Sequence, residues 1–112
     1  MEDDMIDRMY VQMYADAIQE AEGRRAEGYN YLQPSMVTVE YGRRFARMVV
    51  DNGTQRFVHA FVDLTNGDVV KAAGWKAPQR GVNGLAVRFN LLDDESRETC
   101  FAKCGDYGYL YA

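Results

Sequence analysis

The sequence predicts a single α+β domain in which an N-terminal helix packs on an antiparallel β-meander, followed by a short C-terminal helix and a last strand. Three observations predict this class. Apolar residues recur at helical spacing near the N-terminus, Asn-Gly turns separate strand-like runs in the middle, and a short acidic helical segment follows. Because the strands follow one another through tight turns, we expect an antiparallel sheet with the helices packed on one side.

Length and composition agree with one small domain. The chain has 112 residues, 47% of them hydrophobic, and forms one domain over residues 1–112, with the N-terminal helix in residues 1–28 and the sheet, an inserted Trp/Lys loop and the short helix in residues 36–112. The formal net charge of −4 argues against binding to duplex DNA. No apolar run approaches the ~18 residues of a membrane span, and the acidic start has the wrong charge for a signal peptide, so we expect a cytoplasmic protein without a membrane partner.

The N-terminal helix is predicted from residue 3 to about residue 26. Acidic residues stand in its first turn, and Arg24 and Arg25 stand near its end, as the helix dipole favours. Its apolar stripe either covers one face of the sheet or, in part, also forms an oligomer contact, because it is rich in methionine and tyrosine. The stripe consists of Met5, Ile6, Met9, Tyr10, Met13, Ala17, Ile18 and Ala21.

The strands are predicted from turn signals and short apolar runs. Asn52-Gly53 is a strong hairpin signal, because a type I′ turn needs positive φ at both positions, and Asn66-Gly67 marks a second turn. The predicted strands span residues 36–41, 43–51, 54–63, 68–73, 85–92 (a strand or a buried turn) and 107–111, and the short acidic helix spans residues 93–103.

A two-residue turn at residues 52–53 also predicts the register of the first hairpin. Val50 then lies opposite Gln55, and Arg47 lies opposite Val58, unless a bulge shifts the pairing. Alternation gives a core face under the helix that consists of Ala46, Met48, Val50, Phe57, His59 and Phe61. The opposite face collects Arg43, Phe45, Arg47, Val49, Arg56, Val58, Ala60 and Val62.

Arg47 and Arg56 are diagonal neighbours on this second face, within reach of one anion. Like charges at that spacing repel unless a negative group joins them. Two interpretations stay open. The arginines are solvated and paired with surface carboxylates, or they form the wall of a phosphate pocket or a subunit interface.

The segment Lys71–Gly81 is the strongest candidate for ligand binding. It holds the only tryptophan, Trp75, with Lys76 and Arg80 nearby and a proline that stiffens the backbone. An aromatic plane among cations suits stacking on a base while the cations contact phosphates, although a single tryptophan after a strand is also often a core or edge plug. Further candidates for base, ribose or aromatic contacts are Arg88, Asn90 and Tyr107.

No catalytic or metal-binding pattern accompanies this segment. His59 is the only histidine, falls on the predicted core face and has no serine or cysteine partner at a recognisable spacing. Cys100 and Cys104 are spaced more widely than a C-x-x-C motif, so we expect two reduced, structural thiols. The sequence therefore predicts a binding protein that is not an enzyme and uses no metal and no cofactor.

The second half of the chain resembles small proteins encoded in many bacteriophage genomes. The resemblance rests on the block F-V-D-L-T-N-G-D-V-V-K-A-A-G-W-K-A-P-Q-R-G at residues 61–81, with its Lys-x-x-x-Trp-Lys-Ala-Pro pattern, and on R-F-N-L-L-D-D at residues 88–94. Within that set the chain looks most like the first type of anti-Thoeris sponge protein. This resemblance implies a small α+β homo-oligomer that binds a cyclic ADP-ribose isomer between protomers and sequesters this defence signal without cleaving it.

The leading hypothesis is therefore a phage anti-defence protein of the host bacterial cytoplasm whose partner is a small anionic nucleotide. A base would stack on the tryptophan or a tyrosine, and basic side chains would hold phosphates. Two alternatives stay open: a phage inhibitor or accessory protein that contacts a host nuclease or CRISPR-type complex, and a weak single-stranded nucleic-acid binder. The residues expected to bind the ligand are Arg47, Arg56, Trp75, Lys76, Arg80, Arg88, Asn90 and Tyr107.

Overall fold

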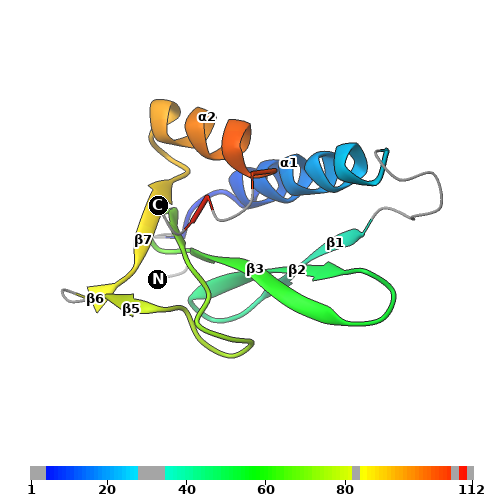
Figure 1. Cartoon of the computed structure of the whole chain (residues 1–112). Coiled ribbons are helices and arrows are strands. Elements are labelled where there is room, and N and C mark those ends of the chain that lie inside the picture. The colour runs from blue at the N-terminus through cyan, green and yellow to red at the C-terminus, as the bar shows by residue number, and fades with distance from the viewer. Residues whose placement is uncertain (1–4, 28–34, 82–83, 107–108, 111–112) are drawn as a thin grey trace.

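The computed structural model describes residues 5–27, 35–81, 84–106 and 109–110. Within them the fold is α+β, as the sequence predicts: an N-terminal helix, a five-stranded antiparallel sheet in meander order and a short C-terminal helix (Figure 1). The sheet order is β1-β2-β3-β4-β7, and a separate hairpin, β5-β6, is inserted before the last strand. The elements are α1 (Arg8–Glu27), β1 (Met36–Tyr41), β2 (Phe45–Asp51), β3 (Arg56–Asp63), β4 (Asp68–Val70), β5 (Arg80–Gly81), β6 (Gly84–Leu85), β7 (Val87–Asn90) and α2 (Asp94–Lys103).

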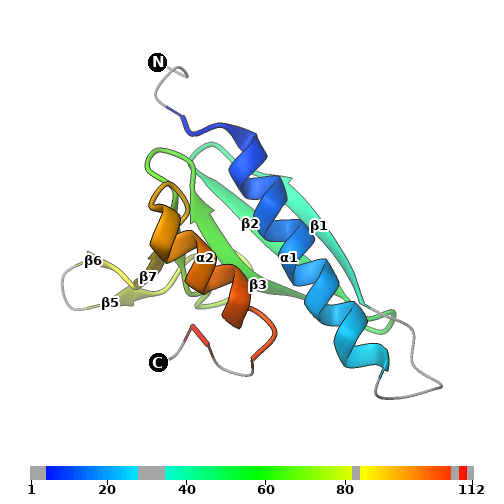
Figure 2. The same ribbon diagram turned by 90° about the horizontal axis from the view of Figure 1, so that it is seen from above.

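The two helices lie on the same side of the sheet. Figure 1 shows them above the strands, and Figure 2 shows α1 lying over β1 and β2, with α2 beside it. α1 packs against β1, α2 packs against β7, and the two helices also contact each other. The β5-β6 hairpin and the loop before it extend away from the helices (Figure 1). One face of the central strands is therefore covered by helices, and the other is left to the inserted segment.

α1 begins later and buries a different stripe than the sequence predicts. Asp7 accepts a hydrogen bond from the backbone N–H of Met9 (2.9 Å) and caps a helix that begins at Arg8. Met5, Met9 and Met13 are 38–52% exposed, so the predicted stripe is wrong at these positions. The predicted stripe also leaves out Val11, Tyr14 and Ala15, which lie on the side of the helix that faces the strands and are buried there. The buried hydrophobic residues of α1 are Val11, Tyr14, Ala15, Ile18 and Ala21.

The turn between β2 and β3 is longer than predicted, so the predicted register is wrong. Asp51 pairs with Arg56, which leaves a connection over residues 52–55. The Asn52 side chain stabilises this wider turn, because its Oδ1 accepts hydrogen bonds from the backbone N–H groups of Thr54 (3.0 Å) and Gln55 (2.9 Å). The turn therefore closes around an asparagine side chain and not as a two-residue type I′ hairpin.

A β-bulge next to Val49 shifts the pairing a second time. Val49 pairs with Val58 and Met48 pairs with Ala60, so His59 is the extra residue of β3. An extra residue reverses the direction in which every later side chain of that strand points, relative to the unbulged pattern.

The bulge makes the predicted faces wrong for the second half of β3. Ala60 and Val62, predicted on the open face, are fully buried in the core under the helices. Phe61, predicted in that core, lies on the opposite face, where its ring meets Phe45 edge to face with centroids 6.0 Å apart. The residues before the bulge keep their predicted faces, because the longer turn moves the pairing by an even number of positions.

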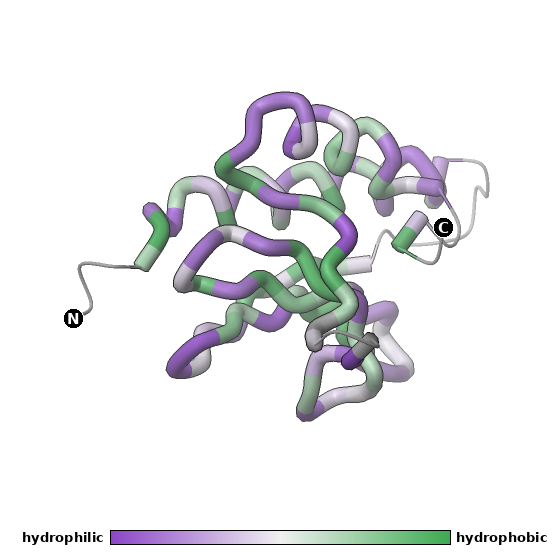
Figure 3. Tube along the Cα trace, turned by 90° about the vertical axis from the view of Figure 1, so that its left-hand side faces the viewer, coloured by the Kyte–Doolittle hydropathy of each residue, from purple (hydrophilic) through white to green (hydrophobic). Residues whose placement is uncertain are grey.

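The main core fills the space between the helices and the sheet. Figure 3 shows hydrophobic and hydrophilic residues interspersed along helices and strands, as expected of elements with one buried and one exposed side. None of the helices in the described ranges is long and apolar enough to cross a membrane. The buried core residues on the strands and in the segments after them are Ala46, Met48, Val50, Ala60, Val62, Leu64, Val69, Leu91, Cys100, Cys104 and Leu110.

The C-terminal part contains the predicted short helix, but the strands beside it are shorter than predicted. Asp93 caps α2 by accepting hydrogen bonds from the N–H groups of Glu95 and Ser96. β4 and β7 are shorter than predicted, because the chain leaves the sheet for the inserted hairpin between them. Of the predicted last strand, residues 107, 108 and 111 lie outside the described residues, and Tyr109 and Leu110 form a turn.

Candidate ligand-binding site

Two excursions leave the sheet between β4 and β7 and share one backbone junction. At this junction Gln79 donates to the carbonyl of Lys71 (2.7 Å), Ala86 donates to the carbonyl of Gln79 (2.8 Å), and Lys71 donates to the carbonyl of Ala86 (3.3 Å). The first excursion, residues 72–78, is called the Trp75 loop, and an isolated bridge closes its base. The second excursion is the β5-β6 hairpin. The junction fixes where both excursions begin and end.

The Trp75 loop folds back onto the face of the sheet that the helices leave open. The guanidinium carbons of Arg47 in β2 and Arg56 in β3 lie 5.0 and 5.2 Å from the centre of the Trp75 ring. Both distances are within the range of cation–π attraction. The Trp75 side chain is 38% exposed, so it is not a plug of the main core. The fold thus brings together three of the residues that the sequence predicts in one site.

Glu40 in β1 is the negative group that joins the two arginines. One of its carboxylate oxygens lies 3.4 Å from Nη1 of Arg47, and the other lies 2.7 Å from Nη2 of Arg56. This is the pairing with a surface carboxylate that the first interpretation of the arginines expects. Sequence reasoning missed Glu40, which becomes visible once β1 is aligned with β2, where it lies directly opposite Arg47.

A cleft of about 250 Å³ opens beside the Trp75 ring. Its lining is largely apolar and includes Phe57, which is 45% exposed, while Arg56 supplies a charge. Pockets for whole small ligands usually measure about 300–1,000 Å³. This cleft therefore has room for one planar ring system, and a larger ligand would extend beyond it.

Most of the other predicted site residues lie elsewhere or make contacts within the protein. Lys76 is exposed in the Trp75 loop. Arg80 lies in β5 and lines a different cleft. Arg88 in β7 donates from Nε to the carbonyl of Leu110 (2.6 Å). Tyr107 lies outside the described residues.

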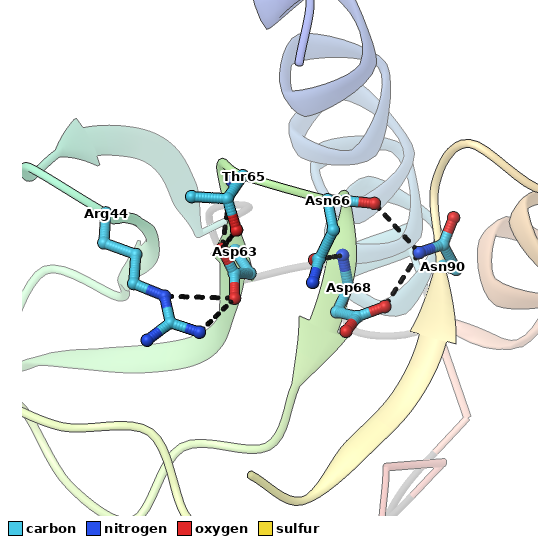
Figure 4. Close-up of polar contacts among 6 residues, drawn as sticks. All are labelled: Arg44, Asp63, Thr65, Asn66, Asp68 and Asn90. Atoms are coloured by element: carbon cyan, nitrogen blue, oxygen red, sulfur yellow. Dashed lines mark hydrogen bonds and ion pairs between the residues drawn. The ribbon is translucent and has the colours of Figure 1, made fainter. Parts of the chain in front are cut away.

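Asn90 holds the β3–β4 turn against the end of β7 (Figure 4). Its Nδ2 donates to the carbonyl of Asn66 (3.0 Å) and to Oδ1 of Asp68 (2.7 Å). Its Oδ1 accepts from the backbone N–H groups of Leu92 (2.8 Å) and Asp93 (3.1 Å). Both ends of the side-chain amide are engaged within the protein, which favours a structural role over the predicted contact with a base or ribose.

A second cleft, of about 490 Å³, lies where the second half of the Trp75 loop and the β5-β6 hairpin meet the start of β2 and the end of β3. Its volume is in the range of small-molecule sites. No lining residue is shared with the cleft beside Trp75. The lining combines charged, polar and apolar side chains: Arg44, Phe45, Asp63, Asn66, Asp68, Ala77, Pro78, Arg80, Gly84 and Val87.

Asp63 is a buried carboxylate of this second cleft (Figure 4). Its Oδ2 accepts from Nε (3.2 Å) and Nη2 (2.8 Å) of Arg44, and its Oδ1 accepts from the hydroxyl (2.6 Å) and N–H (3.0 Å) of Thr65. Burial by itself raises the pKa of Asp63, but these hydrogen bonds outweigh burial and hold its pKa below the ordinary value. The carboxylate therefore stays ionised and anchors Arg44 at the cleft.

His59 belongs to a partly buried aromatic cluster between α1 and β3. Its Nε2 lies 2.6 Å from the hydroxyl of Tyr109, which is also hydrogen-bonded to the hydroxyl of Tyr14. Burial, with a smaller contribution from the charge of Arg25, lowers the pKa of His59 to about 4. Burial likewise raises the pKa of both tyrosines, so all three groups are neutral at pH 7. The histidine is the hydrogen-bonded core residue that its sequence context favours.

Neither a metal centre nor a reactive thiol is assembled by the residues that the structure describes. Within the described ranges, no group of three or more His, Cys, Asp and Glu side chains is placed to hold a metal ion. Cys100 and Cys104 are free, buried thiols, and burial raises the pKa of both, to about 12 for Cys100. Both cysteines are therefore protonated members of the core.

The fold and the site together define a class: a small α+β domain whose sheet carries helices on one face and an arginine-backed aromatic loop on the other. The chain belongs to a family of unknown function, DUF7717, whose model matches residues 3–112. A search of the curated proteins finds no match, and neither does a search of the solved structures.

Proposed function

We propose that this protein binds a small anionic nucleotide and holds it unchanged, as a phage-encoded sponge for a cyclic immune signal such as a cyclic ADP-ribose isomer in the cytoplasm of the bacterial host. One structural observation carries the binding part of the proposal. Trp75 presents a partly exposed ring over Arg47 and Arg56, next to a cleft of about 250 Å³. The bacteriophage resemblance of the second half of the chain supports the anti-defence part.

The same contacts suggest how a nucleotide binds. An adenine ring enters the cleft and stacks on Trp75, whose ring is partly exposed there. Its phosphates then replace the carboxylate of Glu40 as the partner of the arginines, because a phosphate accepts more hydrogen bonds and carries more charge than one carboxylate. No bond is formed or broken, and release leaves the ligand intact.

Affinity arithmetic makes a homo-oligomer part of this proposal. A sponge of nanomolar affinity needs about 12 kcal/mol, whereas stacking of one base contributes about 1–3 kcal/mol and each hydrogen bond to a charged group about 1.5–3 kcal/mol. Four hydrogen bonds from the two arginines and one stacked base amount to about 7–15 kcal/mol, but association itself costs roughly 4–15 kcal/mol. One Trp75 cluster therefore falls short of that total, and a second protomer must add contacts. Met36, which is 62% exposed on the edge strand β1, provides apolar surface for such an interface. Light scattering after size exclusion measures the number of protomers.

Calorimetric titration with cyclic ADP-ribose isomers tests the proposal. The wild-type protein should bind at least one isomer tightly, and mass spectrometry after heat denaturation should recover the ligand unchanged. Trp75→Ala should abolish binding while its circular dichroism spectrum stays native. Arg24→Ala is the matched control, because this arginine is exposed on α1 and pairs with Glu20, away from the sheet face that carries Trp75.

Two results would replace the proposal with its alternatives. If no cyclic nucleotide binds below millimolar concentration and a host nuclease or CRISPR component co-purifies, the protein is an inhibitor that acts through protein contact. If an oligodeoxythymidine binds and the cyclic nucleotides do not, the Trp75 loop is a single-stranded nucleic-acid site.

A further inference from the structure

The cleft of about 490 Å³ has the composition of a second ligand site. Phe45, Pro78 and Val87 supply apolar wall, and charged side chains of both signs converge on the same space. An apolar lining with a few placed polar groups is the usual make-up of a small-molecule site. None of these residues belongs to the Trp75 cluster or its cleft.

Two arginines, Arg44 and Arg80, line this cleft and have hydrogen-bonding capacity to spare. Arg44 uses Nε and Nη2 on Asp63, which leaves its Nη1 without a partner among the described residues. Its side chain is 56% exposed, and its guanidinium carbon lies 4.9 Å from the centre of the Phe45 ring, so its position is fixed while it remains open to solvent. Arg80 is exposed in β5 and forms no ion pair within the part of the chain that the structure describes.

Asp68 adds a hydrogen-bond acceptor to the same cleft. Its Oδ1 accepts from Nδ2 of Asn90 (2.7 Å), which orients the carboxylate (Figure 4). Its Oδ2 accepts no hydrogen bond from any described residue. A fixed carboxylate oxygen without a donor suits a hydroxyl group of a ligand.

We propose that this cleft is a second small-molecule site, for a phosphorylated sugar. Arg44 and Arg80 bind the phosphate, because two guanidinium groups match its charge and its several acceptor oxygens. Asp68 accepts a hydrogen bond from a sugar hydroxyl. Phe45 and Pro78 pack against the sugar carbons. This site does not depend on the nucleotide site at Trp75.

Ribose 5-phosphate is the probe for this site, and amide chemical shifts in nuclear magnetic resonance spectra report where it binds. Saturable shifts are expected at Arg44, Asp68 and Arg80, and they should persist in Trp75→Ala. Inorganic phosphate should bind about tenfold more weakly, because it lacks the hydroxyl that Asp68 accepts, and one such hydrogen bond is worth roughly 1.4 kcal/mol. Ribose alone should not bind.

Three variants sharpen the test. Arg80→Ala should abolish the shifts, whereas Lys103→Ala, which removes one exposed cation from α2, should leave them unchanged. Asp68→Asn should lower the affinity for ribose 5-phosphate to that for inorganic phosphate. The proposal is overturned if the shifts do not saturate, if they centre on Trp75, or if inorganic phosphate binds as tightly as ribose 5-phosphate. If these results hold while cyclic ADP-ribose isomers fail to bind, this site stands and the function proposed for Trp75 is rejected.

Discussion

The two faces of the central strands differ in what their side chains contact. On the face under the helices, Met48 and Val50 are fully buried in the core. On the other face, Arg47 and Arg56 stay partly exposed and lie against Trp75. Neighbouring residues of one strand thus serve opposite faces. Core packing at Met48 and Val50 and candidate binding at Arg47 and Arg56 thus depend on different residues, so either set can be substituted without the other, although Val49 is also fully buried on the face of the arginines.

The largest effect that tests this contrast is on stability. Ile18→Ala removes a fully buried side chain of α1 and should lower the free energy of unfolding by about 2–5 kcal/mol, since it leaves a cavity. Trp75→Ala removes a partly exposed ring and its two cation–π contacts, and should cost about 1–2 kcal/mol. Urea unfolding followed by circular dichroism measures both. Equal losses would mean that Trp75 belongs to the core and that the two faces do not differ in this way.

Acid should lower the free energy of unfolding through His59, by less than the upper end of the Ile18→Ala effect. The folded-state pKa of His59 is about 4, below the ordinary value of about 6.5, so between these values the unfolded chain binds a proton that the folded protein does not. The stability contributed by the neutral histidine is complete above pH 6.5 and is lost as the pH falls toward 4, by up to about 3 kcal/mol.

Urea midpoints at pH 7, 5.5 and 4.5 measure this loss. Asp63 contributes little to the pH dependence of stability in that range. Its pKa is lowered from an ordinary value of 3.8, so the stability from its ionised form is lost only below that pH. His59→Gln, which keeps a hydrogen-bonding group beside Tyr109, should flatten the profile. A wild-type midpoint that is the same at pH 7 and pH 4.5 would contradict the burial of a neutral histidine.

The smallest effect on stability is expected on the open face. Glu40→Gln removes the charge that Arg47 and Arg56 share and should change the free energy of unfolding by less than about 1 kcal/mol, because all three side chains are partly exposed. Calorimetry should show several-fold tighter binding of an anionic nucleotide, since no carboxylate then competes for the arginines. Glu20→Gln on α1 is the matched control. Weaker binding in Glu40→Gln would show that Glu40 orients the arginines for the ligand.

Much of the division of β2 and β3 residues between the two faces of the sheet could be predicted from the sequence, because it follows from the two-residue period of a strand. Arg47 and Arg56 share a face in the predicted register and in the observed one, since the longer turn shifts the pairing by an even number of positions. Ala60 and Val62 were placed on the wrong face, because the bulge at His59 comes after that shift and reverses the alternation. No local pattern in β3 signals this bulge.

The candidate sites were predictable only where the side chains lie on one strand pair or in one loop. Trp75 meets Arg47 and Arg56 as the residue types suggested. Arg80, grouped with them in the sequence prediction, lines a separate cleft, because the backbone junction at Gln79 sends the Trp75 loop and the β5-β6 hairpin out as two excursions. That junction consists of backbone hydrogen bonds, and these carry no side-chain signature.

The sequence by itself determined the α+β class, the order of the N-terminal helix, the main sheet strands and the short C-terminal helix, and the placement of Arg47 and Arg56 on one face. These features depend on spacing within one segment, and 3.6- and 2-residue periods are visible in a linear chain. The tertiary structure decided that Glu40 joins the two arginines and that Asp63 and Arg44 build a second cleft. Those contacts join residues that are distant along the chain, and turn length, bulge position and the path of the inserted segment determine which of them meet.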